Sequence, residues 1–320
     1  MTARRIGYGA ALLALAAFPL TGATFYGELV TKVMILAILA LSLDLLVGFT
    51  GLVSFGHAAY YGIGAYALAL ATPRYQPASL WVTLPLAVGA AGIGAAAVGA
   101  LAVRTKGTYF IMVTLAFAQM FHFVFHDTEF GRGSDGISMN FKPSAALARF
   151  APFDLASPTQ LYYFVLLCLV ASFAFLAFLL RSPMGRALQG IRSNEHRMIS
   201  LGYPVFRYKL ASFTIAGGMA GLAGYLSALQ FGFVNPELLS WHQSGSALLM
   251  LILGGPGRLY GGVAGAFAFV ALQELFQALT TRWQLPFGLA IILLVIFLPG
   301  GLGSVVDRFR RPPPREPFHV

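Results

Sequence analysis

The chain has 320 residues, of which 58% are hydrophobic and 10% are charged, and its net charge is +10. Soluble domains contain about 25% charged residues, so this composition excludes a protein that folds in water and predicts one embedded in a lipid bilayer. The Arg and Lys residues form short clusters between long apolar runs, which is typical of cytoplasmic loops and argues against nucleic acid as a partner. The single cysteine, Cys168, excludes an intrachain disulfide and a cysteine-rich metal site.

Ten apolar runs are long enough to cross a membrane, because a helix needs about 20 residues to span about 30 Å of hydrocarbon. They lie at about 6–27, 33–50, 53–72, 79–103, 108–126, 160–180, 209–231, 238–257, 261–280 and 284–303. The sequence therefore predicts an all-α, polytopic membrane helix bundle of about ten transmembrane helices, with a single domain at 1–310 and a tail at 311–320. The boundaries at 48–51 and 254–258 are weak, and each also fits a break within a re-entrant segment.

The basic clusters predict the orientation of the chain. They lie at 4–5, 104–106, 181–209 and 308–315, whereas the loop at 127–159 is mixed in charge. Ten crossings place all four clusters in the cytoplasm if both termini are cytoplasmic, and the 127–159 loop is then periplasmic. Five runs precede this loop and five follow it, so an inverted 5+5 repeat is a further hypothesis.

The first run also has features of a signal peptide, since two arginines precede it and small residues at 21–23 follow its apolar stretch. The apolar stretch is longer than a usual signal core, which favours a retained helix.

The sequence contains no familiar enzymatic motif. None of its four lysines follows a glycine, so it has no Walker A loop, and neither His-Glu-x-x-His nor Gly-x-Ser-x-Gly occurs. We therefore expect a chain that is not an enzyme, that binds no ATP, metal or cofactor of its own, and that relies on a separate chain for ATP hydrolysis.

Ionisable side chains fall inside the predicted spans, among them Asp44, Glu274, His57 and His122. A charge at bilayer depth costs a few kcal/mol at least, so it usually faces a cavity or a partner. Asp44 and Glu274 are therefore candidates for a transport role, although each also fits a carboxyl group neutralised by a hydrogen-bonding neighbour. For His57, a hydrogen-bonded packing histidine is favoured over a metal ligand.

The segment 181–209 is polar and lies between two spans. Pro183 can start a helix, which we expect to run from Gly185 to Ser200 and to end before Gly202 and Pro204. The expected helix has an apolar side and a basic side, formed by Ala187, Leu188 and Ile191 and by Arg186, Arg192 and Arg197. Such a helix suits docking on a soluble partner, and a solvated loop that only sets orientation is the open alternative.

Six stretches carry a family resemblance: GFTGLVSFGHAAYYGIGAYALAL at 48–70, KGTYFIMVTLAFAQM at 106–120, GRGSDGI at 131–137, SPMGRALQGIRSNEHRMISLGYPVFRYKLASF at 182–213, GGPGRLYGGVAGA at 254–266 and LPFGLAIILLVIFLPGGL at 285–302. In order and spacing, from about residue 33 to 303, the chain resembles the branched-chain amino acid permease family of ABC importers, and most of all its LivM-type subunits.

The resemblance implies a multi-pass permease subunit in the bacterial inner membrane that translocates branched-chain or related amino acids. It implies three kinds of partner: a LivH-type permease subunit, two cytoplasmic ATPase subunits that bind ATP, and a periplasmic substrate-binding protein. A self-sufficient, ion-coupled secondary transporter of a small polar solute, using Asp44 and Glu274, is the alternative. Permeases for urea, short amides and aromatic acids share much of the pattern, so the substrate stays open.

The resemblance also implies roles for individual residues. The coupling helix at 183–202 would seat on the ATPase through Gly185, Arg186, Ala187, Arg192, Asn194, Glu195 and Gly202. The candidates for the translocation pathway are Asp44, which lies inside a predicted span, and four residues that the resemblance implies: Ser54, His57, Thr114 and Gln119. The periplasmic loop would meet the binding protein through Arg132, Ser134 and Asp135. The family usually has Thr-Gly-Gly where this chain has Gly131, Arg132 and Gly133, so we expect the extra charge to alter docking or substrate preference.

Overall fold

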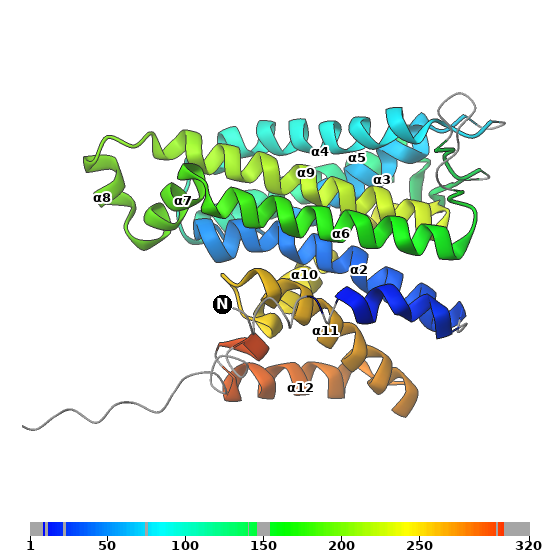
Figure 1. Cartoon of the computed structure of the whole chain (residues 1–320). Coiled ribbons are helices and arrows are strands. Elements are labelled where there is room, and N and C mark those ends of the chain that lie inside the picture. Colours follow the sequence, from blue (N-terminus) through cyan, green and yellow to red (C-terminus); the bar gives the residue numbers. More distant parts are fainter. Residues whose placement is uncertain are drawn as a thin grey trace, which may run out of the picture.

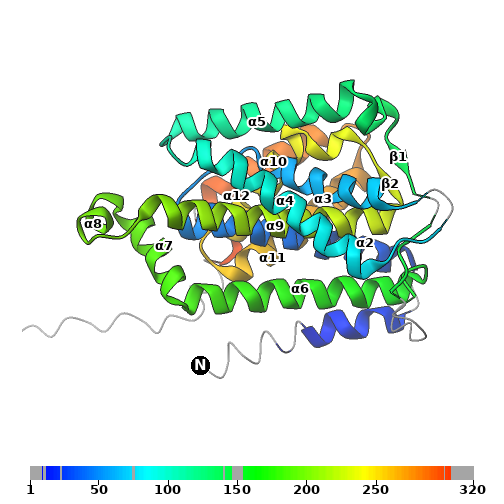
Figure 2. The same ribbon diagram turned by 90° about the horizontal axis from the view of Figure 1, so that it is seen from above.

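A computed structural model describes residue 9 and residues 12–21, 24–73, 76–139, 141–145, 154–298 and 300–303. Its long helices run side by side and form an elongated bundle (Figures 1 and 2). The α-helices are α2 (Thr24–Asp44), α3 (His57–Ala71), α4 (Leu80–Ala102), α5 (Thr108–Asp127), α6 (Pro158–Arg181), α7 (Pro183–Ser193), α8 (Glu195–Ser200), α9 (Val205–Phe231), α10 (Trp241–Gly254), α11 (Leu259–Leu279) and α12 (Gln284–Phe297). The fold is thus helical, as predicted.

Short elements complete the described fold. They are the π-helix η2 (Leu45–Thr50), the 3₁₀ turns η1 (Phe18–Thr21), η3 (Glu129–Gly131), η4 (Gly133–Asp135) and η5 (Pro236–Leu239), and the two-residue strands β1 (Ile137–Ser138) and β2 (Phe233–Val234). The strands pair antiparallel, with Ile137 opposite Val234. This pairing fixes part of the 127–159 loop to the end of α9.

Within the part of the chain that the structure describes, seven helical stretches are long and apolar enough to cross a membrane: Phe25–Thr50, Leu80–Ala102, Thr108–Asp127, Pro158–Arg181, Val205–Phe231, Leu259–Leu279 and Gln284–Gly303. The helices α3 and α10 have 15 and 14 residues, and at about 1.5 Å per residue each falls short of about 30 Å. The chain is therefore a polytopic membrane bundle, whereas the count of ten crossings, the side of each terminus and the inverted repeat stay predictions.

Three predicted boundaries are wrong. The second span begins at Thr24 instead of about residue 33, because the helix continues through the isolated charges Glu28 and Lys32, and residues 24–27 therefore belong to α2 instead of the first span. The third begins at His57, after a non-helical stretch at 51–56. The eighth is shorter than predicted and covers only Trp241–Gly254. The basic clusters at 4–5 and 308–315 lie outside the described residues, as do residues 22 and 23 of the predicted cleavage site, whereas residues 12–21 of the first run are described and end in η1.

The bundle core lies around α9, which packs on α2, α3 and α4. Small residues allow this close approach: a Cβ atom on Gly64 would lie 2.5 Å from the Gly221 Cα, and one on Gly224 would lie 2.7 Å from the Tyr61 carbonyl carbon. The helix backbones are therefore in direct contact, which is how helices associate where lipid provides no hydrophobic drive. The helices α10 and α11 pack together, and α11 joins this pair to α2 (Figure 1).

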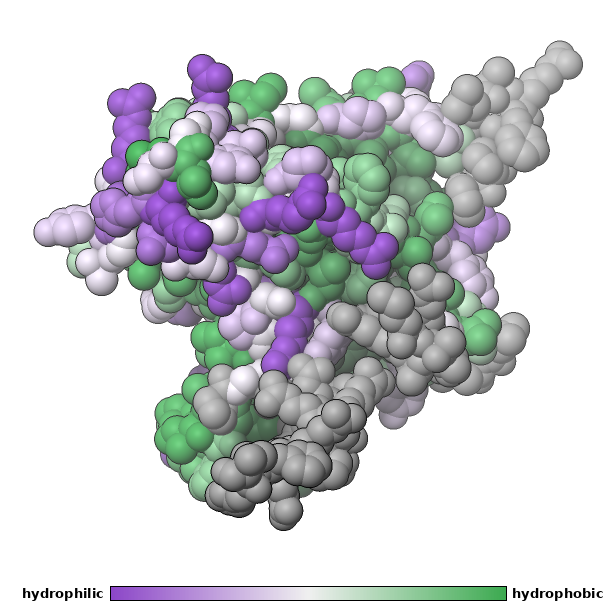
Figure 3. Space-filling model, turned by 60° about the vertical axis from the view of Figure 1, so that its left-hand side comes forward, coloured by the Kyte–Doolittle hydropathy of each residue, from purple (hydrophilic) through white to green (hydrophobic). Residues whose placement is uncertain are grey.

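The two ends of the bundle differ. The helices α7 and α8 lie at one end, and β1 and β2 lie at the other (Figure 2). Turned so that the α7–α8 end comes forward, the molecule shows hydrophilic side chains gathered there, with apolar side chains over much of the remaining surface (Figure 3). The polar 181–209 segment and the described part of the 127–159 loop thus occupy opposite ends of the bundle, and their placement on opposite sides of the membrane stays a prediction.

Candidate functional site

The helix α7 begins with a sharp turn after α6. The Ser182 hydroxyl accepts a hydrogen bond from the Gly185 amide at 3.4 Å, and Pro183 occupies the first turn. A Cβ atom on Gly185 would lie 2.6 Å from the Leu180 carbonyl oxygen, so this turn requires glycine. Ala187, Leu188 and Ile191 are buried while Arg186 is exposed. The structure confirms the apolar and polar faces predicted for this helix.

The prediction of one continuous helix over Gly185–Ser200 is wrong. Asn194 has extended backbone angles (φ −159°, ψ 100°), and it separates α7 from α8. Its side-chain oxygen accepts a hydrogen bond from the Arg197 amide at 3.0 Å, which makes Asn194 the N-cap of a new helix. The coupling segment is therefore a helix pair whose joint is Asn194.

Glu195 joins α8 to the base of the bundle. Its carboxylate lies 2.9 Å from the Lys209 Nζ on α9 and 3.5 Å from the Lys106 Nζ before α5. Lys209 is buried, and a buried lysine needs such a partner. Partial burial of Glu195 by itself raises the pKa of its carboxyl group, but the hydrogen bonds and charges of Lys209 and Lys106 outweigh burial and place this pKa below its usual value. The Glu195 carboxylate thus links α8 to two lysines elsewhere in the bundle, Lys209 on α9 and Lys106 before α5.

Gly202 ends the helix pair for a conformational reason. Its φ is +81°, in the left-handed region, and a Cβ atom there would meet nothing within 4 Å. The glycine therefore shapes the turn that leads from α8 to α9.

Arg192 connects α7 to the broken end of α2. Its Nη1 donates a hydrogen bond to the carbonyl oxygen of Gly48 in the π-helix. On the neighbouring turn, the Gly257 amide donates to Asp44 Oδ1 at 2.8 Å. The side chain of Asp44 is fully buried, and the Arg192 charge interacts with it electrostatically. We call these four residues, Asp44, Gly48, Arg192 and Gly257, the junction.

The junction has no spare room. A Cβ atom on Gly48 would lie 2.8 Å from Asp44 Cγ and closer still to the Gly257 nitrogen, and one on Gly257 would lie 2.9 Å from Arg192 Nη1. One alternative left open by the sequence was that a hydrogen-bonding neighbour neutralises Asp44, and the Gly257 amide is such a neighbour. The role of Asp44 in the translocation pathway stays a prediction. The sequence marked 48–51 and 254–258 only as weak boundaries and did not predict the contact of Asp44 with Gly48 and Gly257, because a glycine carries no side chain that signals a contact.

Three of the predicted pathway residues gather where α3 begins. The His57 Nε2 lies 2.7 Å from the hydroxyl of Ser42, which confirms a hydrogen-bonded packing histidine. The Phe55 amide donates to Thr114 Oγ1 at 3.3 Å, and the Gly56 amide donates to Ser54 Oγ at 3.2 Å. These polar groups satisfy the non-helical backbone at 51–56 inside the bundle, as membrane proteins require.

Two further buried serines support the same break and were not predicted. The hydroxyl of Ser244 accepts a hydrogen bond from the Ala58 amide at 2.9 Å, and the Thr50 hydroxyl lies 2.8 Å from that of Ser212. Gln119 lies about one and a half turns beyond Thr114 along α5 and is partly exposed. The structure thus brings Ser54, His57 and Thr114 together, and Gln119 is not among the groups that hold the break.

The predicted docking residues lie at the opposite end of the bundle from α7. Ser134 and Asp135 are exposed in the short turn η4, and Arg132 is exposed between η3 and η4 with a positive φ of 58°. Residues 140 and 146–153 of the same loop lie outside the described residues. The docking role of this loop stays a prediction.

Comparisons with known proteins agree with this architecture. The family described as "Branched-chain amino acid transport system / permease component" matches residues 25–298. The chain is 34% identical over 312 residues to the high-affinity branched-chain amino acid transport system permease protein LivM of Escherichia coli (strain K12), covering 91% of this chain and 73% of that protein. The chain belongs to the branched-chain amino acid permease family.

Other relatives of the permease include both kinds of subunit. It is 34% identical over 294 residues to LivM of Salmonella typhimurium, covering 86% of this chain and 69% of the relative. It is 23% identical over 280 residues to LivH of Escherichia coli (strain K12), covering 83% and 91%. No solved structure matches the chain significantly.

Family membership makes the permease a membrane-spanning subunit of a transport system, which is not an enzyme. In keeping with this, the polar groups described above satisfy backbone breaks and connect helices. At the α7–α8 end, the junction and the Glu195 ion pairs link α7 and α8 to α2, to α9 and to the turn before α11.

Proposed function

We propose that this permease forms one half of the translocation pathway of an ATP-driven importer in the bacterial inner membrane. Its cargo would be branched-chain or related amino acids, which a periplasmic binding protein delivers. A LivH-type chain would form the other half, and two cytoplasmic ATPase subunits would bind ATP. The family match and the likeness to LivM proteins support this proposal.

The observation that carries the proposal is the attachment of α7 and α8 to the bundle. Their outer surface is exposed and basic, while Arg192 and Glu195 reach inward to α2 and α9. ATPase closure would displace the helix pair, and these two contacts would transmit the displacement to the π-helix and to the base of α9. A transporter that switches between inward and outward openings needs a connection that transmits movement to the helix bundle.

The experiment is ATP-dependent uptake in proteoliposomes that contain the permease, its partner chains and the binding protein. Leucine uptake should require ATP, and a panel with urea, acetamide and benzoate distinguishes the related substrate classes. Glu195→Gln and Gly202→Ala should lower uptake per ATP hydrolysed while the complex stays assembled, and Glu237→Gln, an exposed acid at the other end, is the matched control.

Two results would reject the proposal. If both variants take up as much leucine per ATP hydrolysed as the wild type, α7 and α8 do not couple ATP hydrolysis to transport. Uptake by the permease alone, driven by an ion gradient without nucleotide, would favour the secondary-transporter alternative.

A further inference from the structure

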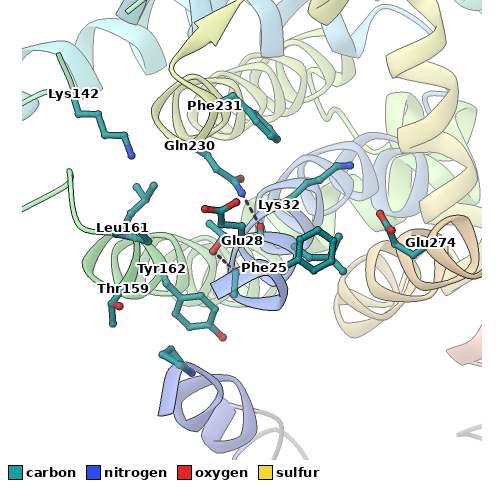
Figure 4. Close-up of a pocket in the computed structure, with 15 residues that line it drawn as sticks. Phe25, Glu28, Lys32, Lys142, Thr159, Leu161, Tyr162, Gln230, Phe231 and Glu274 are labelled. Atoms are coloured by element: carbon teal, nitrogen blue, oxygen red, sulfur yellow. Dashed lines mark hydrogen bonds between the residues drawn. The ribbon is translucent and has the colours of Figure 1, made fainter. Parts of the chain in front are cut away.

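A hollow of about 380 Å³ opens at the end of the bundle opposite α7 and α8. Residues of α2, α6, α9 and α11 line it, together with Lys142 from the loop before α6 (Figure 4). A second hollow of about 540 Å³ adjoins it, because both are lined by Lys32, Gln230 and Phe231. Small-molecule pockets usually measure about 300–1,000 Å³, so the first hollow has the size of a ligand site.

Four charged side chains surround the first hollow. Lys32 and Lys142 are positive, and Glu28 and Glu274 are negative (Figure 4). None of the four takes part in the ion pairs found among the described residues. The walls therefore offer charges of both signs that do not neutralise each other directly, and this suits a ligand that itself carries both charges.

The side-chain oxygen of Gln230 indicates that the ligand carries a hydrogen-bond donor. Gln230 Nε2 donates a hydrogen bond to the Glu28 carbonyl oxygen at 2.7 Å, which fixes the amide group. Its Oε1 is buried and has no hydrogen-bond partner among the described residues. A buried acceptor without a partner is costly, and an amide oxygen can be satisfied only by a donor such as an ammonium group.

Apolar side chains complete the lining. Phe25, Leu29, Leu161 and Phe231 line the same hollow. They would contact the aliphatic part of a ligand, whereas the second hollow is lined partly by the polar groups of Asn235, Gln243 and Ser246. The second hollow is also lined by apolar side chains such as Ile35, Leu36 and Leu238, so it offers a continuation for a small solute that has polar and apolar parts.

We propose that this pocket binds a free α-amino acid as its zwitterion, a step that rests on the proposed function. The ammonium group of the amino acid donates to Gln230 Oε1 and lies near Glu28, and its carboxylate faces Lys32, the next charged side chain in Figure 4. The aliphatic side chain packs on the apolar wall. The site is a first stop for the solute on the side where the binding protein releases it.

The test is equilibrium binding of radiolabelled leucine to the purified importer complex in nanodiscs, without the binding protein. Lys32→Met, Glu28→Gln and Gln230→Leu should each weaken binding by about tenfold or more, as expected for loss of one charged or buried hydrogen-bonding partner. Glu237→Gln should leave binding unchanged. Leucinamide lacks the carboxylate and 4-methylpentanoate lacks the ammonium group, so each should compete at least about tenfold more weakly than leucine.

Three outcomes would overturn the site. The first is that leucine does not bind to the wild-type complex, and the second is that its affinity is unchanged in the three variants. The third is that phosphoethanolamine displaces leucine, which would assign the pocket to a lipid headgroup. Assembly and ATP hydrolysis of each variant complex verify that it is folded. ATP-driven leucine uptake with the binding protein separates the two proposals: if uptake persists, only the site has failed, and if wild-type uptake is absent, the proposed function has failed as well.

Discussion

Substitution of Gly48 by alanine is the most informative perturbation of the junction. The added methyl group would lie 2.8 Å from Asp44 Cγ and closer to the Gly257 amide nitrogen. The carboxylate cannot move away without losing its hydrogen bond from that amide, and the amide belongs to the backbone. The substitution should therefore break the contact between α2 and the turn before α11.

The cost follows from the two interactions that are lost. Overpacking of a dense site costs about 1–3 kcal/mol, and loss of a hydrogen bond to a charged group costs about 1.5–3 kcal/mol. The better helix propensity of alanine offsets about 1 kcal/mol. The expected destabilisation is about 1.5–5 kcal/mol, which at about 2 °C per kcal/mol corresponds to a melting temperature lower by about 3–10 °C.

The assay is thermal unfolding of the purified permease in detergent, followed by size-exclusion chromatography. Gly89→Ala is the matched control, because a Cβ atom at that position in α4 meets nothing within 4 Å. The Gly89→Ala variant should melt at the wild-type temperature or slightly above it. If Gly48→Ala behaves in the same way, the junction is not close-packed and the reasoning is refuted.

Two other outcomes are expected at the α7–α8 end. Asn194→Ala removes the N-cap of α8 and should weaken that helix by about 0.5–2 kcal/mol, seen as faster amide hydrogen exchange in α8 only; equal exchange would contradict the capping role. The pKa of Glu195 is lowered in the folded protein by Lys209 and Lys106, so its stabilisation is full above the unfolded pKa of about 4.3 and is lost as the pH falls through the folded pKa. Glu195→Gln should therefore lower the melting temperature at pH 7 and flatten its decrease under acid, and an unchanged acid profile would contradict the pairing.

Local patterns predicted much of the helical architecture. Apolar runs of about 20 residues identified the long spans, and the spacing of Ala187, Leu188 and Ile191 identified the buried side of α7. The same reasoning missed the end of α7, because Asn194 caps a second helix within a sequence whose helical periodicity continues. Here a side-chain hydrogen bond competes with helix propagation, and periodicity does not register it.

The contacts that define the sites could not be predicted from local sequence. Arg192 meets Gly48 and Asp44 meets Gly257, pairs that are far apart in the chain and that include glycines without side chains. The pocket likewise combines Glu28, Lys142, Gln230 and Glu274, which lie in four separate segments. Only the packing of α2 against its neighbours brings such residues together.

Site-directed crosslinking tests the central claim, that the α7–α8 pair is the surface through which an ATPase moves the bundle. In a Cys168→Ala background, Gln189→Cys places a thiol on the exposed side of α7, and Ser138→Cys places one on the exposed side of β1 at the opposite end. We predict that Gln189→Cys forms a crosslink to the ATPase that changes with nucleotide, and that Ser138→Cys does not. A crosslink of Gln189→Cys to the binding protein, or none to the ATPase, would contradict the account.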